Sequence, residues 1–514
     1  MRIYTLFVLF LIVTVTCSFS PCVLREEAHG PICVCNATYC DTIEPLGTVV
    51  SGKSVVYTSS KTGKRLKRSE HEAKKTTHAK VKLTFNASEQ FQTIMGFGGA
   101  FTDAVGINLE NIGSNMADQI INQYYGEEGL GYVYGRVPMA SCDFSVREYS
   151  YDDTDLDFEL TNFKLADEDV KYKIPYIKKA RAASKNALKL FATPWSAPGW
   201  MKTNGRMIGG GKLLGDQNGK YYNTWANYFV KFFEEYHKLG IDFWATTVQN
   251  EPTSGLDPNY KWQTMYFSAS MERNFIKKLL GPALQANAVT GNLTIMINDD
   301  QRYNLPHWPD TILNDPMAAK YVSGIALHWY EDFIEPATVL TTTHNRHPDY
   351  FLMATEACAG YIGSTGPELG KWSRAEEYAN SLIRDISNWV TGFVDWNLVL
   401  DMIGGPNLVK NYVDAAIIIN KDKQEYYKQP IWHVMAHFSK FVKPGAIRIG
   451  TYIAEKINDI EGVAFLNKDG TKTVVILNRD PVLPHSISIS DVSVPDQFYT
   501  LELDANSIVT IILK

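Results

Sequence analysis

Eight short apolar runs recur along the middle of the chain, and this repeat limits the fold more than any other feature. Each run ends in a polar or aromatic stop and is followed by a longer stretch with helical spacing, as at Tyr228, Phe232 and Tyr236. Strands that alternate with helices indicate a parallel sheet, and eight of them predict an α/β fold of the (β/α)₈ barrel type. The runs cover residues 94–100, 131–138, 188–192, 243–248, 293–297, 324–327, 351–354 and 392–394.

The pattern changes after about residue 446. Short runs at 463–466, 473–477, 487–489 and 508–513 are separated by turn residues such as Asp469-Gly470, which is typical of antiparallel strands in a β-sandwich. We expect the early runs at 55–57 and 81–85 to complete the same sandwich. The polar, basic segment 53–80 is interpreted as an exposed loop or hairpin, because such charge runs usually form solvated faces.

Charge and length narrow the classes of protein. The chain has 514 residues, enough for a barrel with smaller domains, and a formal net charge of −6. It contains no extended basic tract interleaved with aromatic residues, so nucleic acid is not an expected partner. Arg2, the apolar stretch 6–15 and the small residues Thr16 and Ser18 form a signal-peptide layout. We therefore expect a soluble protein that enters the secretory pathway.

The cysteines agree with an oxidising compartment. Cys17 falls in the signal segment, and the next four crowd together, which in a secreted chain indicates two disulfides. Three pairings are possible, and we favour Cys22–Cys33 with Cys35–Cys40 because it closes two short, separate loops. A zinc site is the rival, but no histidine or further cysteine stands nearby at ligand spacing.

Other features fit the same compartment. Three Asn-X-Ser/Thr sequons occur, at Asn36, Asn86 and Asn292, each a potential glycosylation site. Cys142 and Cys358 remain unpaired in this scheme. Each lies within two positions of a candidate active-site acid, Asp143 or Glu356, yet we interpret both as small buried thiols, since free cysteine is among the most buried residue types.

Two glutamates stand at the ends of apolar runs. Glu251 closes the stretch that ends in Asn250-Glu251-Pro252, and Glu356 closes the run 351–354. Their separation, 356 − 251 = 105 positions, fits three strand–helix units and assigns them to strands four and seven. Both carboxylates would then face one cleft, the arrangement of glycoside hydrolysis. The alternative is two unrelated solvated acids.

The other stops also suit a sugar site. Active sites of this fold lie at the C-terminal ends of the strands, and sugars need aromatic platforms beside carboxylates or amides. Candidate platforms are Trp195, Trp329, Tyr330 and Trp396, each of which could instead be structural. The polar stops are Asp103, Cys142-Asp143, Thr193, Asn250-Glu251, Asp299-Asp300, His328, Glu356, Asp395 and Asn397.

Other chemistries find less support. The chain has no His-Glu-X-X-His zinc helix and no Gly-X-Ser-X-Gly elbow. The segment Gly209-Gly210-Gly211-Lys212 lacks the spacing and the Lys-Ser/Thr ending of a phosphate loop, and is interpreted as a loop at the rim. We expect neither a metal nor another cofactor.

Several stretches resemble a known family. They are CVCNATYC (33–40), MGFGGA (95–100), RVPMASCDFS (136–145), WANYFVKF (225–232) and HFSKF (437–441). These closely resemble the glucosylceramidases of glycoside hydrolase family 30, and the likeness runs over nearly the whole chain after the signal segment.

The resemblance implies a domain organisation. It combines a catalytic (β/α)₈ barrel, a β-sandwich and a small antiparallel sheet domain that carries the disulfides. We assign residues 1–20 to the signal peptide, 21–45 with 398–429 to the small domain, 46–91 with 446–514 to the sandwich, and 92–397 with 430–445 to the barrel.

The resemblance also implies an activity. Family members hydrolyse glucosylceramide to glucose and ceramide in the lysosome, with retention at the anomeric carbon. By motif, Glu251 resembles the acid/base and Glu356 the nucleophile. The residues that resemble the binding set are Asp143, Trp195, Asn250, Trp396 and Asn411 for the glucosyl unit and Tyr330 for the cleft.

Partners follow from the same resemblance. A saposin-type activator and anionic lipid are expected, with peripheral contact to the lumenal membrane through residues 361–362 and 260–262. The chain departs from the family at Gln249, at Leu408 and in the loop 361–370. Because these positions face the aglycone side, the alternative is a retaining β-glycosidase for another sugar or aglycone.

Overall fold

The computed structural model describes residues 19–454 and 459–514. The signal peptide expected over residues 1–20 lies, except for its last two residues, outside the described part. Among the described residues, no helix is long and apolar enough to cross a membrane.

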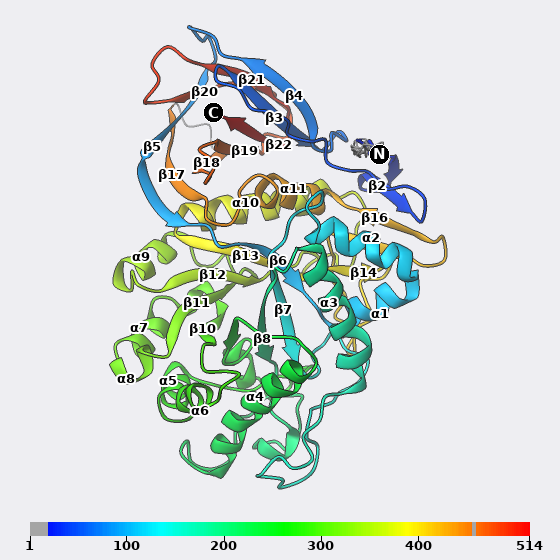
Figure 1. Ribbon diagram of the computed structural model, residues 1–514, viewed down its shortest axis with the longest axis vertical. Coiled ribbons are helices and arrows are strands. Elements are labelled where there is room, and N and C mark those ends of the chain that lie inside the picture. The colour runs from blue at the N-terminus through cyan, green and yellow to red at the C-terminus, as the bar shows by residue number, and fades with distance from the viewer. Residues whose placement is uncertain (1–18, 455–458) are drawn as a thin grey trace, which may run out of the picture.

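The centre of the molecule is a closed barrel of eight parallel strands, as predicted (Figure 1). The order around the barrel follows the chain, because each strand pairs with the next one and the last pairs with the first. All eight apolar runs contain or overlap a barrel strand. The strands are β6 (Gly96–Ala100), β7 (Tyr134–Met139), β8 (Lys189–Pro194), β9 (Ala245–Thr247), β10 (Thr294–Gln301), β11 (Val322–His328), β12 (Phe351–Glu356) and β13 (Val390–Asn397).

Helices surround the barrel and bury their apolar faces against it. In the longest, Trp225, Phe229, Phe232 and Tyr236 recur at helical spacing and are all buried. The helices are α1 (Asp103–Ile112), α2 (Ser114–Tyr125), α3 (Ile174–Ala183), α4 (Lys220–Lys238), α5 (Ala269–Phe275), α6 (Gly281–Ala286), α7 (His307–Leu313), α8 (Pro316–Ala319), α9 (Thr338–Arg346), α10 (Trp372–Ser387) and α11 (Pro430–Ser439).

An early segment of the chain, residues 53–93, and its last strands meet in a nine-stranded sheet. Its edge segments approach each other, since Lys74 and Phe498 form a backbone bridge, so the sheet folds over a core shared by alternate residues such as Phe85, Ile476 and Ile511. The sandwich prediction is therefore confirmed, and β17 and β21 are strands that the sequence analysis missed. In spatial order the strands are β21 (Tyr499–Leu503), β20 (His485–Asp491), β5 (Val81–Thr93), β17 (Ile447–Ala454), β18 (Ile460–Leu466), β19 (Lys472–Asn478), β22 (Ser507–Leu513), β3 (Lys53–Ser60) and β4 (Lys67–Glu72).

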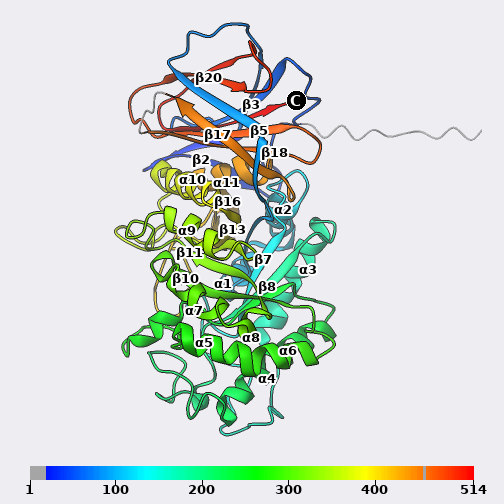
Figure 2. The same ribbon diagram turned by 90° about the vertical axis from the view of Figure 1, so that its left-hand side faces the viewer.

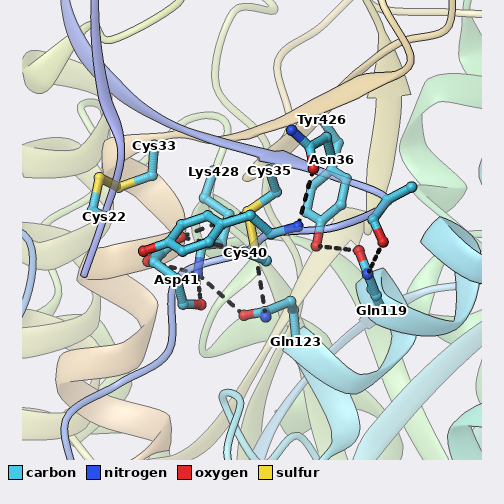
Figure 3. The surroundings of a disulfide bond; sticks show 12 residues. Cys22, Cys33, Cys35, Asn36, Cys40, Asp41, Gln119, Gln123, Tyr426 and Lys428 are labelled. Carbon is cyan, nitrogen blue, oxygen red and sulfur yellow. Dashed lines mark hydrogen bonds and ion pairs between the residues drawn. A yellow bond between two sulfur atoms is a disulfide. The ribbon is translucent and has the colours of Figure 1, made fainter. Parts of the chain in front are cut away.

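A third, five-stranded sheet carries the disulfides Cys22–Cys33 and Cys35–Cys40, the pairing that we favoured. Gln123 of α2 donates to the Cys40 sulfur at 3.5 Å and accepts from Lys428, which fastens this sheet to the barrel (Figure 3). Its pairs are antiparallel except that β14 runs parallel to β15. The strand order is β1 (Leu24–Glu27), β2 (Gly30–Asn36), β16 (Glu425–Lys428), β15 (Ile417–Asn420) and β14 (Val399–Asp401).

The sandwich and the barrel meet across α10 and α11, which lie between them in both views (Figures 1 and 2). All ten residues of α11 are buried. His437 of α11 bonds to Thr510 of β22 and to Ser59 of β3, each at 2.9 Å. These contacts fix α11 to strands from the early and the late part of the chain.

Candidate active site

A cavity of about 240 Å³ opens at the C-terminal ends of the barrel strands. Its lining contains both candidate catalytic residues, Glu251 and Glu356. All six expected substrate-binding residues line it as well, namely Asp143, Trp195, Asn250, Tyr330, Trp396 and Asn411. Side chains from distant parts of the sequence thus converge on one hollow, at the end of the barrel where this fold places its active sites.

The side chains that form the floor of this cavity point into the barrel because every second residue of a strand faces inward. One buried apolar layer comes from Tyr134, Phe191, Ala245, Met296, Ala326, Met353 and Val394, one residue from each of seven consecutive strands. Side chains that point into a barrel recur every second residue. Two positions further along these strands the inward layer becomes polar, and it contains Arg136, Thr193, Thr247, His328, Thr355 and Trp396.

Strand β10 departs from this rule. Its pairing with β11 shifts register between Asn298 and Asp300, and both Asn298 and Asp299 have positive φ. A bulge of this kind re-aims side chains. As a result Asp299, three residues beyond Met296, joins the polar layer and accepts hydrogen bonds from Arg136 at 2.9 Å, Thr247 at 2.8 Å and Thr355 at 2.7 Å.

Glu356, at the end of β12, is held by two donors. The guanidinium of Arg136 donates to Oε2, and the hydroxyl of Tyr330 donates to Oε1 at 2.7 Å. Arg136 is itself fully buried and also donates to Asn250 Oδ1 at 2.9 Å. A paired cation and a hydroxyl donor together fix the orientation of this carboxyl group in the buried site.

Glu251 lies four residues beyond β9, at the start of the 3₁₀ helix η3 (Pro252–Leu256). Its Oε1 receives hydrogen bonds from Gln301 Nε2 and His328 Nδ1, both at 3.0 Å, and its Oε2 lies 3.4 Å from the Tyr260 hydroxyl. Ligand atoms of Glu251, His328 and Glu356 all lie within 4.8 Å of one another. The two carboxyl groups therefore face each other across a gap that admits one reacting centre.

His328 connects the polar layer to Glu251. Its Nε2 lies 3.1 Å from Asp299 Oδ1 while its Nδ1 contacts Glu251. Burial acts to lower its pKa, but Glu356, Asp299 and Glu251 together raise it to about 10. Asp299 shows the converse effect, because burial favours its neutral form but Arg136 and His328 hold its pKa below the usual range. Arg136, Asp299 and His328 thus follow one another in the polar layer with alternating charge.

The other side of the cavity presents an aromatic platform and a polar edge. Trp195 and Trp396 stack with ring centroids 5.2 Å apart. Asp143 accepts hydrogen bonds from Asn411 at 3.0 Å and Asn407 at 3.2 Å. Burial, and the charges of Glu356 and Glu251, raise the pKa of Asp143 to about 7, although both amides act in the opposite direction.

Not every strand-end residue joins the site. Trp329 is buried against Tyr378 and Phe393 and donates to the Cys358 carbonyl, so the expectation of a platform there is wrong. Asp103 is buried with Lys173, and Asp395 accepts from the Tyr378 hydroxyl at 2.7 Å; neither lines the cavity. Asp395 points outward because it lies between the inward-facing Val394 and Trp396 of β13, whereas Asp103 and Trp329 lie beyond the ends of their strands.

Several residues of the site had no role in the sequence analysis. Arg136 and Thr355 belong to the inward layer and could have been found by extending the period of two. Gln301 has no comparable signal, because it reaches Glu251 only through the bulge in β10. The rim residues that also line the cavity are Phe144, Trp262, Glu331, Tyr361 and Val413.

The expected modification sites lie far from the cavity lining. Asn292 is exposed, whereas Asn36 and Asn86 are half-buried. The Asn36 side chain accepts from the Thr38 amide and hydroxyl within its own sequon. Cys142 and Cys358 are free and buried, and burial raises the pKa of both thiols, which opposes thiolate chemistry.

The cluster of Glu251, His328 and Glu356 is compact enough to surround one metal ion. Its bonding opposes that use. Both ring nitrogens of His328 already contact carboxylates, and a pKa of about 10 disfavours the neutral imidazole that a metal requires. Glu356 is compensated by Arg136. The arrangement suits proton transfer and attack by a carboxylate.

Two facing carboxylates above a polar layer in a (β/α)₈ barrel define a glycoside hydrolase site. Comparison with known families agrees. The TIM-barrel domain of glycosyl hydrolase family 30 matches residues 94–442, and the β-sandwich domain of that family matches residues 445–511. The chain belongs to glycosyl hydrolase family 30, which confirms the resemblance seen in its motifs.

Individual relatives cover nearly the whole chain. Putative glucosylceramidase 4 of Caenorhabditis elegans is 66% identical over 494 residues, which is 96% of this chain and 95% of the relative. Lysosomal acid glucosylceramidase of Mus musculus is 42% identical over 490 residues, 94% of this chain and 95% of the relative. The crystal structure of SrfJ from Salmonella typhimurium superposes with a TM-score of 0.82 at 27% identity, covering 90% of this chain and 99% of that one.

Proposed function

We propose that this protein is a retaining β-glucosidase that hydrolyses glucosylceramide to glucose and ceramide. The observation that carries the proposal is the closeness of Glu251 and Glu356, whose nearest ligand atoms lie within 4.8 Å. Retaining enzymes hold their carboxyl groups about 5–5.5 Å apart, and inverting enzymes about 6.5–9.5 Å. The short gap supports direct attack by a carboxylate. The glucosylceramidase relatives support the choice of substrate.

In the first half of the reaction, an oxygen of Glu356 attacks the anomeric carbon. The bond from that carbon to the glycosidic oxygen breaks, and the departing ceramide oxygen takes the proton of Glu251. The product is a glucosyl ester of Glu356. Arg136 and Tyr330 hold the Glu356 carboxyl group aimed at the anomeric carbon.

In the second half, Glu251 acts as a base. A water takes the place of ceramide, gives a proton to Glu251 and attacks the anomeric carbon, which releases Glu356 as a carboxylate. Two inversions give net retention. Because the same residue serves both halves, its carboxyl group has to stay near one position, which Gln301 and His328 favour through their contacts to Oε1.

The remaining site residues would bind the glucosyl unit. The stacked pair of Trp195 and Trp396 presents an apolar face for the C–H side of a pyranose ring, and Asp143 with Asn411 offers acceptors and donors for its hydroxyls. Asn250 is placed beside the acid/base and is oriented by Arg136. These roles are proposals on the basis of geometry.

A lipid substrate also requires contact with a membrane. Loops that leave the C-terminal ends of barrel strands carry exposed apolar side chains: Phe333 is 76% exposed and Ile362 is 68% exposed. Tyr361 and Trp262 are half-buried and line the cavity. We propose that this rim touches anionic lipid at the lumenal face of the lysosomal membrane, with or without a saposin-type activator.

Vesicle flotation tests the membrane contact. The double change Phe333→Ser with Ile362→Ser should reduce binding to anionic vesicles at acidic pH, because it removes apolar area at the rim. Val482, 74% exposed on the sandwich, supplies a matched control in Val482→Ser. Equal loss in both variants would argue against a role for the rim.

A mechanism-based glucosyl label tests the chemistry. The label should attach to Glu356, as located by peptide mass mapping. Glu251→Gln should retain turnover of glucosides with good leaving groups in the first step and then stall until azide releases the intermediate. Attachment at any other residue would refute the assignment. Paired glycosides assayed beside glucosylceramide in anionic lipid decide whether another sugar or aglycone is preferred.

A further inference from the structure

The backbone at Glu251 is strained. This residue has φ 40° and ψ 61°, in the left-handed region, which is unfavourable for a non-glycine residue and persists only when its surroundings hold it. The turn that follows leads directly into η3. Whatever keeps this turn in place therefore also keeps the acid/base carboxyl at its position opposite Glu356.

Three consecutive residues of β10 supply the restraint. The Asp299 carbonyl accepts the Glu251 amide at 3.0 Å, and Gln301 donates to the Glu251 carboxylate at 3.0 Å. Between them, Asp300 accepts from Thr253, from its amide at 3.2 Å and from its hydroxyl at 2.6 Å. The bulge at Asn298–Asp300 makes this possible, because in a regular strand consecutive side chains would point to opposite faces.

Asp300 differs from its neighbours in having no access to substrate. It is 1% exposed and does not line the cavity. Its carboxyl also accepts the amide of Gln301 at 2.8 Å, so both oxygens are used to fix the backbone. Burial and the charge of Glu251 raise the pKa of Asp300 to about 7, which is a sign of how close the two carboxyl groups are.

We propose that Asp300 is a positioning residue of the acid/base, whose carboxyl clamps the strained turn at Glu251 through Thr253. The proposal rests on the proposed role of Glu251. Displacing a catalytic group by about 1 Å can lower the rate about 100-fold. Loss of the clamp should therefore impair proton donation and leave sugar binding and attack by Glu356 largely intact.

The leaving group makes this testable. An alkyl β-glucoside needs a proton to depart, whereas 2,4-dinitrophenyl β-glucoside does not. For Asp300→Ala we expect kcat/KM to fall about 10- to 100-fold on the alkyl glucoside and less than about 3-fold on the dinitrophenyl glucoside. Asp300→Asn keeps an oxygen acceptor for Thr253 but loses the acceptor for the Gln301 amide, so it should recover only part of the loss. Thr253→Val removes the hydroxyl and keeps the backbone amide, so kcat/KM on the alkyl glucoside should fall by a smaller factor. This variant replaces Asp300→Ala in the test if Asp300→Ala does not fold.

Glu272 provides the matched control. It is a buried acid of α5 that accepts from Trp308 at 2.6 Å and from the Asn298 amide, but it does not touch the Glu251 turn. Glu272→Ala should affect both substrates equally. An equal loss on both substrates in the Asp300 and Thr253 variants would overturn the proposal. Glu251→Gln, measured in parallel, separates the two claims: if it shows no dependence on the leaving group, the acid/base assignment fails, and the role of Asp300 fails with it.

Discussion

Two buried histidines in this protein have opposite properties. His328, under the active-site cavity, lies between Glu251 and Asp299, and its pKa is raised to about 10. His437, between the barrel and the sandwich, lies between two hydroxyls, and burial lowers its pKa to about 3. Both side chains are excluded from solvent. Burial alone therefore does not decide charge; the partners do.

The same contrast extends to the regions around them. The barrel end concentrates buried charges, with Arg136, Asp299, His328 and Glu356 in direct contact. The packing of α11 against the sandwich instead uses apolar side chains and neutral hydrogen bonds. Charged networks are costly to bury and are expected where chemistry needs them. The following variants test this division.

The largest effect is expected at the nucleophile. Glu356→Gln leaves no carboxylate to attack, so kcat on any β-glucoside should fall by about 10⁴-fold or more. The fold should persist, because the amide oxygen still accepts from Arg136 and the amide NH₂ can donate to the Tyr330 hydroxyl. Turnover of an aryl glucoside measures the loss of kcat, and thermal unfolding serves as the control for the fold. Substantial residual turnover would place the nucleophile elsewhere.

Arg136→Met probes the charge network itself. The change leaves Asp299 and Glu356 buried without their cation, which should cost about 3–5 kcal/mol of unfolding free energy, because an unpaired buried charge is strongly unfavourable. Urea unfolding at acidic and neutral pH measures the loss. Activity should also fall, since Glu356 loses its orienting donor. A stability close to that of the unmodified protein would mean that the network is not held by charge pairing.

The pattern of apolar and polar residues in the sequence predicted much of the barrel and of the polar residues at its strand ends. Eight apolar runs predicted eight strands, and the period of two, extended past Tyr134 and Phe191, leads to Arg136 and Thr193. The stops at Glu251 and Glu356 followed from the same repeat. What pattern could not supply is the bulge in β10, because the register shift and the positive φ of Asn298 and Asp299 depend on contacts from other strands.

Loops were less accessible to prediction. Asn411 is 268 positions from Asp143, and its hydrogen bond to that residue exists only because a long loop folds back over the cavity. The resemblance to a family identified Asn411 as a binding residue, whereas the periodicity of the sequence gave no indication of its role. The edge strand β21 was missed although Tyr499–Leu503 alternates between buried apolar and less buried polar residues, because the run has only five residues. Local pattern thus defines the barrel, and tertiary contacts define its rim.

His437→Asn tests the neutral region through pH. The pKa of His437 in the folded state, about 3, lies below the unfolded value of about 6.5, so the unfolded state binds more protons between these limits. Its contribution to stability is complete above pH 6.5 and is lost as the pH falls. At pH 4.5 the loss should reach roughly 2–3 kcal/mol. The variant should show a stability difference between pH 7.5 and 4.5 that is smaller by that amount in urea unfolding.

The smallest effect is expected at a hydroxyl beside His437. The Thr510 hydroxyl donates to the His437 carbonyl at 3.0 Å, so its contact with Nδ1 at 2.9 Å requires that Nδ1 carry the proton. Thr510→Val preserves shape but leaves that N–H without its acceptor, at a cost of about 1–2 kcal/mol. Since His437 stays neutral with either residue, the cost should be equal at pH 7.5 and pH 5. A cost that grew at acidic pH would show that the hydroxyl pair, and not burial, keeps this histidine uncharged.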